Sequence, residues 1–492
     1  MKKVRSLILL INTLSRSEKK SIYLNSDLIK GDKAYMELFR LIDKQKIEDS
    51  SLLFELFTKK YPKASFHPEV KYLYEFILGI LVKIKTNQDK NFNLHQKILN
   101  ARILKERNLD TDYYSLLKQL EKEAEEICNH YLLLIIRRME LDFIRTNSFC
   151  DISEKALLKK QHKTNDTLKT IRQIHEQSSL YELLLHRIEK TPLFHKDQRS
   201  FFNDLIVSEI TLVSNLNRDV FEIQKLHQLF QAHYLSHTGD HKSALNSFVE
   251  LDNLFNKNKA LWNNPPLYYV SVLEGILESL LGNKLYDKMP YFIDRLKSIS
   301  HPSVPFQAEV ASIMLVYSIS IHIKRNEYKE CLSLIEQYQQ SLIQKIDLLT
   351  PFRYLQVCLH LAIAYFLNKM YTLARKQIVR IINSDSYTTF GLFKPIQLIN
   401  LIIYYELGDF DYMSSQIRSI KRVNKINKKG SMFESLLFYF LSFDSVFLKK
   451  KSLDLRRKIE TEFALIENIQ EERRYYSFFD FKSWMLMHCK SE

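Results

Sequence analysis

Three histidines near one turn are the residues of this chain best suited to bind a metal ion. His233 and His237 lie four residues apart, so both imidazoles would project from one helix face, as zinc ligands do. Gly239 would break the helix before His241, which turns that third ring elsewhere. Because a metal site needs at least three convergent ligands and no acidic residue lies in register, we expect no metal site here. We interpret His233 and His237 as half-exposed histidines on one helix, and any role they have is contact with a bound partner.

Catalytic chemistry has no recognisable motif in the sequence. There is no Walker A loop, no GxGxxG, no GxSxG and no HExxH, and 8 glycines in 492 residues leave no candidate backbone cradle for phosphate. The carboxylates at Glu121, Glu123, Glu125 and Glu126 are typical of a solvated helix face. We therefore expect a protein that is not an enzyme and that uses no cofactor.

A basic cluster near the C-terminus favours binding of a polyanion. Its members are Arg418, Lys421, Arg422, Lys425, Lys428 and Lys429. Arg418, Arg422 and Lys425 would share a helix face and could contact successive phosphates. The net charge of +15 points the same way, although a chain rich in Lys, Ile and Asn is also what an AT-rich genome encodes. Nucleic acid is therefore the alternative partner.

The elements that would position these residues are helical hairpins that recur about every forty residues along the second half of the chain. The turn residues, taken as pivots, are Gly239, Lys284, Asn326, Lys369 and Gly408, at intervals of 45, 42, 43 and 39 residues. Five residues after each pivot stands a small or slim residue, namely Ala244, Met289, Cys331, Ala374 or Met413. Prolines fall between successive pivots, where the first turn of a new helix tolerates them. Two unrelated patterns with one period predict tandem hairpins.

The segments 232–248 and 362–374 carry a spacing of small residue, aromatic or apolar residue, turn and alanine that resembles the tetratricopeptide repeat (TPR) superfamily. The resemblance covers roughly residues 220–425. The period exceeds the family's usual length of about 34 residues, the first-helix tryptophan is absent, and the closing proline has moved to the start of the next hairpin. The resemblance implies an all-α protein with a right-handed α-solenoid, and long degenerate repeats of this kind look like those of bacterial regulators that bind peptides or partner proteins.

In such a superhelix the first helix of each hairpin forms the inner wall. The residues expected to face inward are His233, Ser236, His237, Ile276, Ser279, Lys324, Ile363, Phe366 and Tyr405. This mostly apolar wall suits an amphipathic or extended peptide, and burial between repeats is the alternative for each residue. The leading hypothesis is a scaffold that binds a protein or peptide partner in its concave surface. We then expect Phe366→Ala and Tyr405→Ala to weaken binding and to leave the fold intact.

Two other functions stay open on the sequence. One is a nucleic-acid-associated protein that binds phosphates through the basic C-terminal cluster. The other is a regulator whose N-terminal helices act as an effector while the array senses a peptide, although residues 1–90 contain no convincing helix-turn-helix.

Composition favours long helices joined by short turns, with 46% hydrophobic residues, 8 glycines and 10 prolines. We expect an N-terminal helical module at 1–90, a helical segment at 91–195 with a degenerate hairpin at 93–127, the repeat array at 196–430, and C-terminal capping helices at 431–492. Five scattered cysteines without a CxxC pair make a disulfide framework or cysteine zinc site unexpected.

The N-terminus imitates a secretory signal without its full pattern. The apolar run at 7–11 is interrupted by Asn12, and no small-residue cleavage site follows, so we expect an amphipathic helix. No apolar run is expected to approach the roughly 18–20 residues that span a bilayer. The sequence therefore favours a cytoplasmic protein without a membrane partner.

Overall fold

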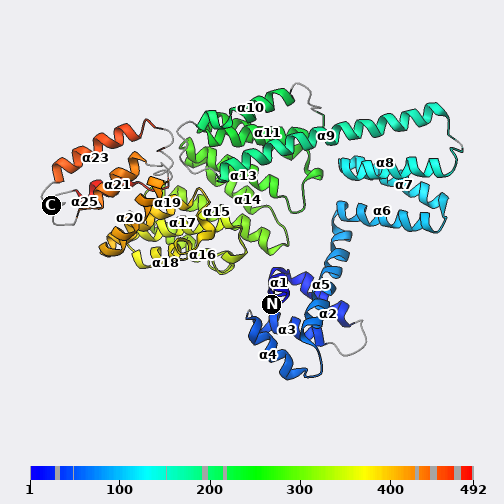
Figure 1. The fold of residues 1–492 in the computed structure, drawn as a ribbon, viewed down its shortest axis with the longest axis horizontal. Helices are drawn as coiled ribbons and strands as arrows, with labels where there is room; N and C mark the ends of the chain where they lie inside the picture. Colours follow the sequence, from blue (N-terminus) through cyan, green and yellow to red (C-terminus); the bar gives the residue numbers. More distant parts are fainter. Residues whose placement is uncertain are drawn as a thin grey trace.

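The chain is all-α, as its composition predicts. The computed structural model describes residues 2–27, 34–47, 49–150, 152–190, 198–213, 219–426, 431–443, 452–469, 472 and 478–489. Within these ranges every regular element is a helix and no strand occurs. The helices follow one another in space largely in chain order (Figure 1).

The first five helices pack around their own core. They are α1 (Lys2–Thr13), α2 (Arg16–Asp27), α3 (Ala34–Gln45), α4 (Ser50–Lys60) and α5 (Phe66–Gln88). Leu7 and Ile11 of α1 are fully buried, and Leu38 and Phe39 of α3 and Leu73 of α5 belong to the same cluster. The apolar run at the N-terminus is thus one face of a packed amphipathic helix, as expected.

A second group of helices zigzags away from α5. It comprises α6 (Lys90–Glu106), α7 (Asp110–Glu126), α8 (His130–Thr146) and α9 (Glu154–Lys190). The hairpin expected at 93–127 is α6–α7, which turns at Asn108 with φ of 56° and buries Ala101 and Leu117. α9 packs against α8 and also against α11, so this 37-residue helix joins the second group to the hairpins that follow (Figure 1).

The central part of the chain is a run of paired helices. Their bounds are α10 (Gln198–Val213), α11 (Phe221–His237), α12 (His241–Lys257), α13 (Leu267–Gly282), α14 (Met289–Lys297), α15 (Val304–Lys324), α16 (Tyr328–Gln337), α17 (Pro351–Leu367), α18 (Tyr371–Ile382), α19 (Phe393–Glu406) and α20 (Phe410–Ile426). Short 3-10 helices connect some of them, at η1 (Lys259–Leu261), η2 (Tyr286–Lys288), η3 (Ile343–Leu348) and η4 (Asp385–Tyr387).

All five predicted pivots lie in the turns between paired helices. Their backbones adopt the left-handed conformation, with φ of 83° at Gly239, 59° at Lys284, 61° at Asn326, 62° at Lys369 and 74° at Gly408. A residue in this conformation ends a helix because it turns the chain, so that the next N–H groups donate to the last free carbonyl groups of the helix. The prolines also lie as predicted, since Pro305 and Pro351 stand in the first turns of α15 and α17. The hairpins and their period are therefore confirmed.

The paired helices form two layers. The first helices α11, α13, α15, α17 and α19 each contact the next in that series. The second helices α12, α14, α16 and α18 each contact both their own first helix and the following one. Small residues make the close packing possible. A Cβ atom on Gly275 of α13 would overlap the ring of Phe248 in α12, and Ala244, Cys331 and Ala374 are fully buried.

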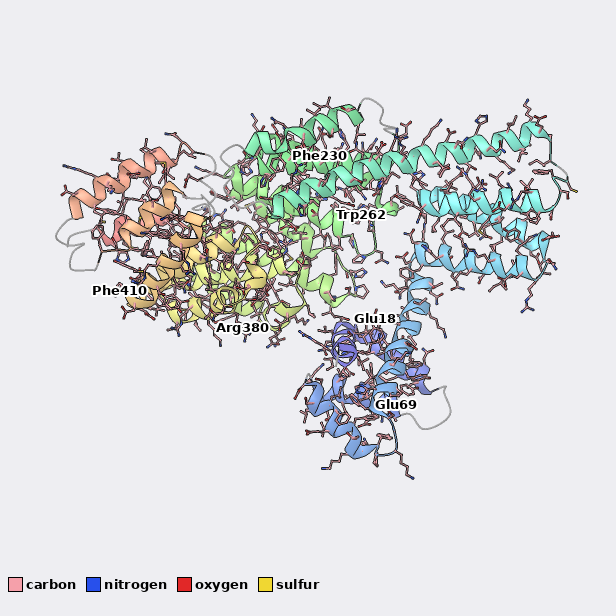
Figure 2. The ribbon with its side chains drawn as sticks, viewed as in Figure 1. Glu18, Glu69, Phe230, Trp262, Arg380 and Phe410 are labelled. Atoms are coloured by element: carbon pink, nitrogen blue, oxygen red, sulfur yellow. The ribbon has the colours of Figure 1, made fainter. Side chains whose placement is uncertain are left out.

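The C-terminal helices share a core with the end of this run. They are α21 (Met432–Phe440), α23 (Ser452–Ile466) and α25 (Phe481–His488). One cluster of buried residues extends from Leu355 in α17 to Trp484 and Met485 in α25, across the boundary expected near residue 430. In the central run, Phe230 of α11 lies among packed helices and is 1% exposed (Figure 2).

One helix is more apolar than the sequence analysis allowed. Within the described ranges, α15 alone is long and apolar enough to cross a bilayer, and the expectation that no run approaches this length was wrong. However, 67% of its apolar window is buried inside the fold, against α13, α14, α16 and α17. This burial is typical of a core helix.

Candidate functional site

The layer of first helices buries most of the residues expected to contact a partner. Ile276, Ser279 and Ile363 are fully buried, and less than a tenth of Ser236, Phe366 and Tyr405 is exposed. These side chains pack against neighbouring helices because each first helix contacts its own second helix and at least one other first helix. The expected apolar wall is therefore core, and the alternative of burial between repeats holds for these six residues.

The chain's own C-terminal segment covers two of these residues. The ring of Phe366 lies 5.3 Å from that of Phe479, and the ring of Tyr405 lies 5.6 Å from that of Trp484. Phe366→Ala and Tyr405→Ala would therefore remove core contacts, and the expectation that they leave the fold intact is contradicted by the packing.

Glu406 at the end of α19 fixes the position of α25. Its Oε1 atom accepts hydrogen bonds from Trp484 Nε1 at 2.7 Å and His488 Nε2 at 2.8 Å. Burial acts to raise the pKa of Glu406, but the hydrogen bonds from His488 and Trp484 outweigh it, and the pKa falls below its usual value. The negatively charged carboxylate thus holds α25, the last described helix, against the end of α19.

The parts of the first helices that remain accessible include a cluster of glutamates. Glu274 of α13 and Glu309 of α15 have side chains 19% and 20% exposed, and Glu278 is exposed. Arg353 of α17 donates to both Glu274 oxygens, at 2.5 and 2.7 Å, and to Glu309 at 3.0 Å. Burial disfavours the charged guanidinium, yet the two carboxylates raise the pKa of Arg353, so it stays protonated. The network holds a surplus of negative charge.

The three histidines point to three different neighbours. The ring of His233 lies between those of Tyr181 and Phe248, at 5.8 and 5.3 Å, and burial lowers its pKa to about 4. His237 packs on Phe202 at 5.3 Å. His241 lies where a Cβ atom on Gly282 would be. No group of three or more histidine, cysteine or acidic residues in the described part of the chain is arranged to hold a metal ion.

The basic residues predicted on α20 lie at the surface. Arg418, Lys421, Arg422 and Lys425 are all exposed, and none of them forms an ion pair within the described ranges. The ammonium of Lys421 lies 5.7 Å from the ring centre of Phe438. Lys428 and Lys429 lie outside the described residues. Lys324, also predicted to face a partner, is exposed at the C-terminal end of α15.

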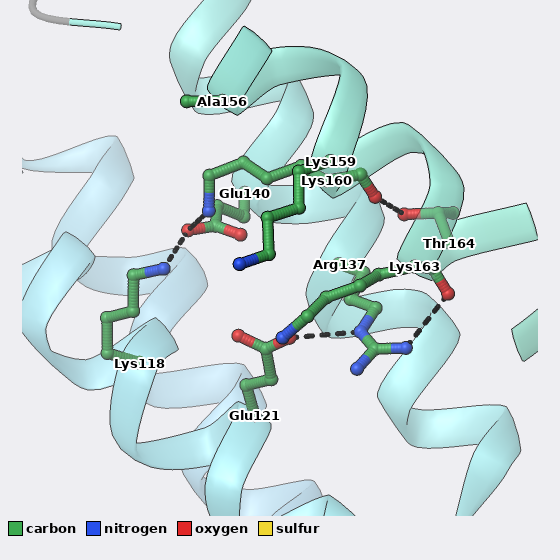
Figure 3. A pocket seen from close by; sticks show the side chains of 9 residues that line it. All are labelled: Lys118, Glu121, Arg137, Glu140, Ala156, Lys159, Lys160, Lys163 and Thr164. Carbon is green, nitrogen blue, oxygen red and sulfur yellow. Dashed lines mark hydrogen bonds and ion pairs between the residues drawn. The ribbon is translucent and has the colours of Figure 1, made fainter. Parts of the chain in front are cut away.

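A cavity lined mainly by charged side chains, which was not predicted from the sequence, lies between α7, α8 and α9. It has a volume of about 250 Å³ (Figure 3). Five cationic side chains line it, namely Lys118, Arg137, Lys159, Lys160 and Lys163, together with the carboxylates of Glu121 and Glu140. The signal was the Lys159-Lys160 pair followed by Lys163, which places three ammonium groups along one stretch of α9. Arg137 and Glu140 come from another helix, so their proximity could not be read from spacing.

Comparisons with protein-family models, with curated proteins and with solved structures found no match for this chain.

Proposed function

We propose that this chain is a non-enzymatic, tetratricopeptide-like α-solenoid that binds a protein partner along its first helices. The observation that carries the proposal is the layer in which α11, α13, α15, α17 and α19 contact one another in chain order, with a left-handed turn after each. Helical hairpins that bury their faces against nearest neighbours are typical of solenoids, whose extended surfaces serve mainly for binding.

The partner surface that we propose differs from the apolar wall expected at first. It is the accessible region around Glu274, Glu278 and Glu309, on two adjacent first helices. Arg353 supplies one positive charge against the two carboxylates of Glu274 and Glu309, and a partner segment with lysine or arginine side chains would neutralise the excess. Complementary charges of this kind set orientation and association rate more than affinity, so neighbouring contacts must supply most of the binding energy.

The test is affinity capture with the full chain from native lysate, treated with nuclease and washed at moderate salt. Three baits are compared: the wild type, Glu278→Lys, and the control Glu330→Lys on the exposed side of α16. Proteins that bind the wild type and the control but not Glu278→Lys support the proposed surface. If all three baits capture the same set, the partner binds elsewhere.

A second function is supported by the exposed basic face of α20. Four cations lie on one helix and have no carboxylate partner among the residues that the structure describes, so they are placed to contact successive phosphates of a nucleic acid. In this case capture would be lost on nuclease treatment. Binding of a labelled oligonucleotide should weaken steeply with salt and be abolished by Arg422→Glu with Lys425→Glu. Lys376→Glu, on the exposed face of α18, is the control.

A further inference from the structure

We propose that the cavity between α7, α8 and α9 is a binding site for a compact polyphosphate group, such as a diphosphate or triphosphate. This site is independent of the proposed partner surface, because it lies in the group of helices that precedes the paired hairpins (Figures 1 and 3). Three properties of the cavity support this assignment: its balance of charge, its available donors and its size.

The charge on one wall of the cavity is unbalanced. Glu140 is only 6% exposed, and its Oε1 atom accepts from both Lys118 Nζ, at 2.5 Å, and Lys160 Nζ, at 2.8 Å. Two ammonium groups are therefore held close together by a single carboxylate oxygen. Two ammonium groups that share one carboxylate oxygen repel each other strongly when they are partly withdrawn from water. An anion bound beside them would relieve the repulsion.

Arg137 of α8 holds together the helices that form the opposite wall of the cavity. Its Nε atom donates to Glu121 at 3.0 Å, and its second amino group donates to Glu125 at 2.6 Å. A further bond runs from the guanidinium to the backbone oxygen of Lys163 at 3.0 Å, which ties α8 to α9. Because Arg137 is already engaged by two carboxylates, it is not the main donor to a ligand.

Lys159 and Lys163 supply the donors. They lie four residues apart on α9, on the rim of the cavity, and both are exposed. Neither forms an ion pair with a carboxylate in the described part of the chain, so their ammonium groups are available to bind oxygen atoms of a ligand. Together with the crowded pair at Glu140, they direct positive charge toward the cavity from two sides. Phosphate oxygens accept from such groups in short charge-assisted hydrogen bonds.

The size of the cavity decides which anion fits. A volume of about 250 Å³ is below the roughly 300–1,000 Å³ typical of pockets for drug-sized ligands. It accommodates two or three linked phosphate groups and leaves a larger attached moiety outside. A nucleic-acid strand fits less well, because it needs an extended basic groove and Glu121 and Glu125 flank this one. The phosphate group could be inorganic or the tail of a nucleotide.

The test is isothermal titration calorimetry of the full chain with inorganic triphosphate and, separately, with adenosine triphosphate. We expect saturable binding of one ligand per chain that weakens with salt. Equal affinities would show that the phosphate chain alone is recognised, and tighter binding of the nucleotide would show that its base or sugar contacts the rim.

Charge-matched variants separate the site from general electrostatic attraction. Lys159→Gln with Lys163→Gln should weaken binding about tenfold to a hundredfold, the loss that corresponds to a missing charge-assisted hydrogen bond. Lys160→Gln should also weaken binding and still fold, since Lys118 remains paired with Glu140. The control Lys122→Gln with Lys169→Gln removes the same charge from exposed positions that do not line the cavity, and it should bind within twofold of the wild type.

Three outcomes would overturn the proposal. They are an absence of saturable binding, an equal loss of affinity in the control variant, and displacement of triphosphate by an oligonucleotide that binds more tightly through the same lysines. The last result would assign the site to nucleic acid.

Discussion

The guanidinium of Arg353 forms a two-pronged ion pair with the carboxylate of Glu274, although 79 residues separate them in the chain. The two N–O distances are 2.5 and 2.7 Å. The pair reaches from α17 to α13, and the intervening helix α15 contributes Glu309 to the same guanidinium. A single side chain thus links three successive first helices.

Replacement of Arg353 by methionine should destabilise the protein by about 2–3 kcal/mol. Loss of one partner from a buried pair typically costs about 3–5 kcal/mol, and the partial exposure of both glutamates reduces this because water can solvate them. Urea unfolding at pH 7 measures the change. Arg325→Met is the control, since its partner Asp287 is 94% exposed and such pairs contribute about 1 kcal/mol or less. Equal effects of the two substitutions would mean that the network contributes no special stability.

Two glycine-to-alanine substitutions should have opposite effects. Gly408 has φ of 74°, and a Cβ atom there would have no neighbour within 4 Å, so the cost of Gly408→Ala comes from the backbone alone. We expect a loss of about 1 kcal/mol, since a residue with a Cβ is strained in the left-handed region. Gly79 lies inside α5, also with open space, and Gly79→Ala should stabilise by about 0.5–1 kcal/mol. Thermal unfolding of both variants tests this, and shifts of the same sign would contradict it.

Local features of the fold could be predicted from the sequence, because they depend on short-range chemistry. A pivot such as Asn326 or Lys369 ends a helix through its own backbone conformation, and prolines such as Pro305 and Pro351 suit the first turn of a helix. The basic face of α20 follows from helical spacing alone, and its four described residues are exposed as that spacing requires.

The contacts between distant segments could not be predicted. An apolar residue at an inner position, such as Phe366, looks the same whether it faces a partner or is covered by a segment more than a hundred residues later, as it is by Phe479. The cavity near Glu140 could not be predicted for the same reason. Its ion pairs join side chains from three helices, and no periodic pattern in one helix reveals the others.

Phe366→Ala should lower the free energy of unfolding by about 3–5 kcal/mol, the usual cost of removing a large aromatic side chain from a core. Phe366 is 5% exposed and contacts the rings of Tyr371 and Phe479. Chemical denaturation measures the change. Tyr291→Ala, at a position 63% exposed, should change stability little. A Phe366→Ala variant that is fully stable yet no longer binds a partner would restore the original interpretation of this position as part of a binding wall.

The buried imidazole of His360 should make the protein less stable in mild acid. His360 is 7% exposed, its Nδ1 atom lies 2.7 Å from the backbone oxygen of Gln356, and burial lowers its pKa to about 4. In the unfolded chain the pKa is about 6.5. Between these two values the unfolded chain binds more protons than the folded one. The contribution of His360 is therefore fully present above about pH 6.5 and is lost as the pH falls toward 4.

At pH 5 this loss amounts to about 2 kcal/mol from His360 alone. The measurement is urea unfolding of the wild type and of His360→Leu at pH 7 and at pH 5. The variant cannot take up this proton, so the difference in stability between the two pH values should shrink by about 2 kcal/mol. His95→Leu, on the exposed face of α6, should leave the difference unchanged. If His360→Leu retains the full dependence on pH, the imidazole is already protonated in the folded protein or reaches solvent, and other groups such as Glu406 must account for the acid sensitivity.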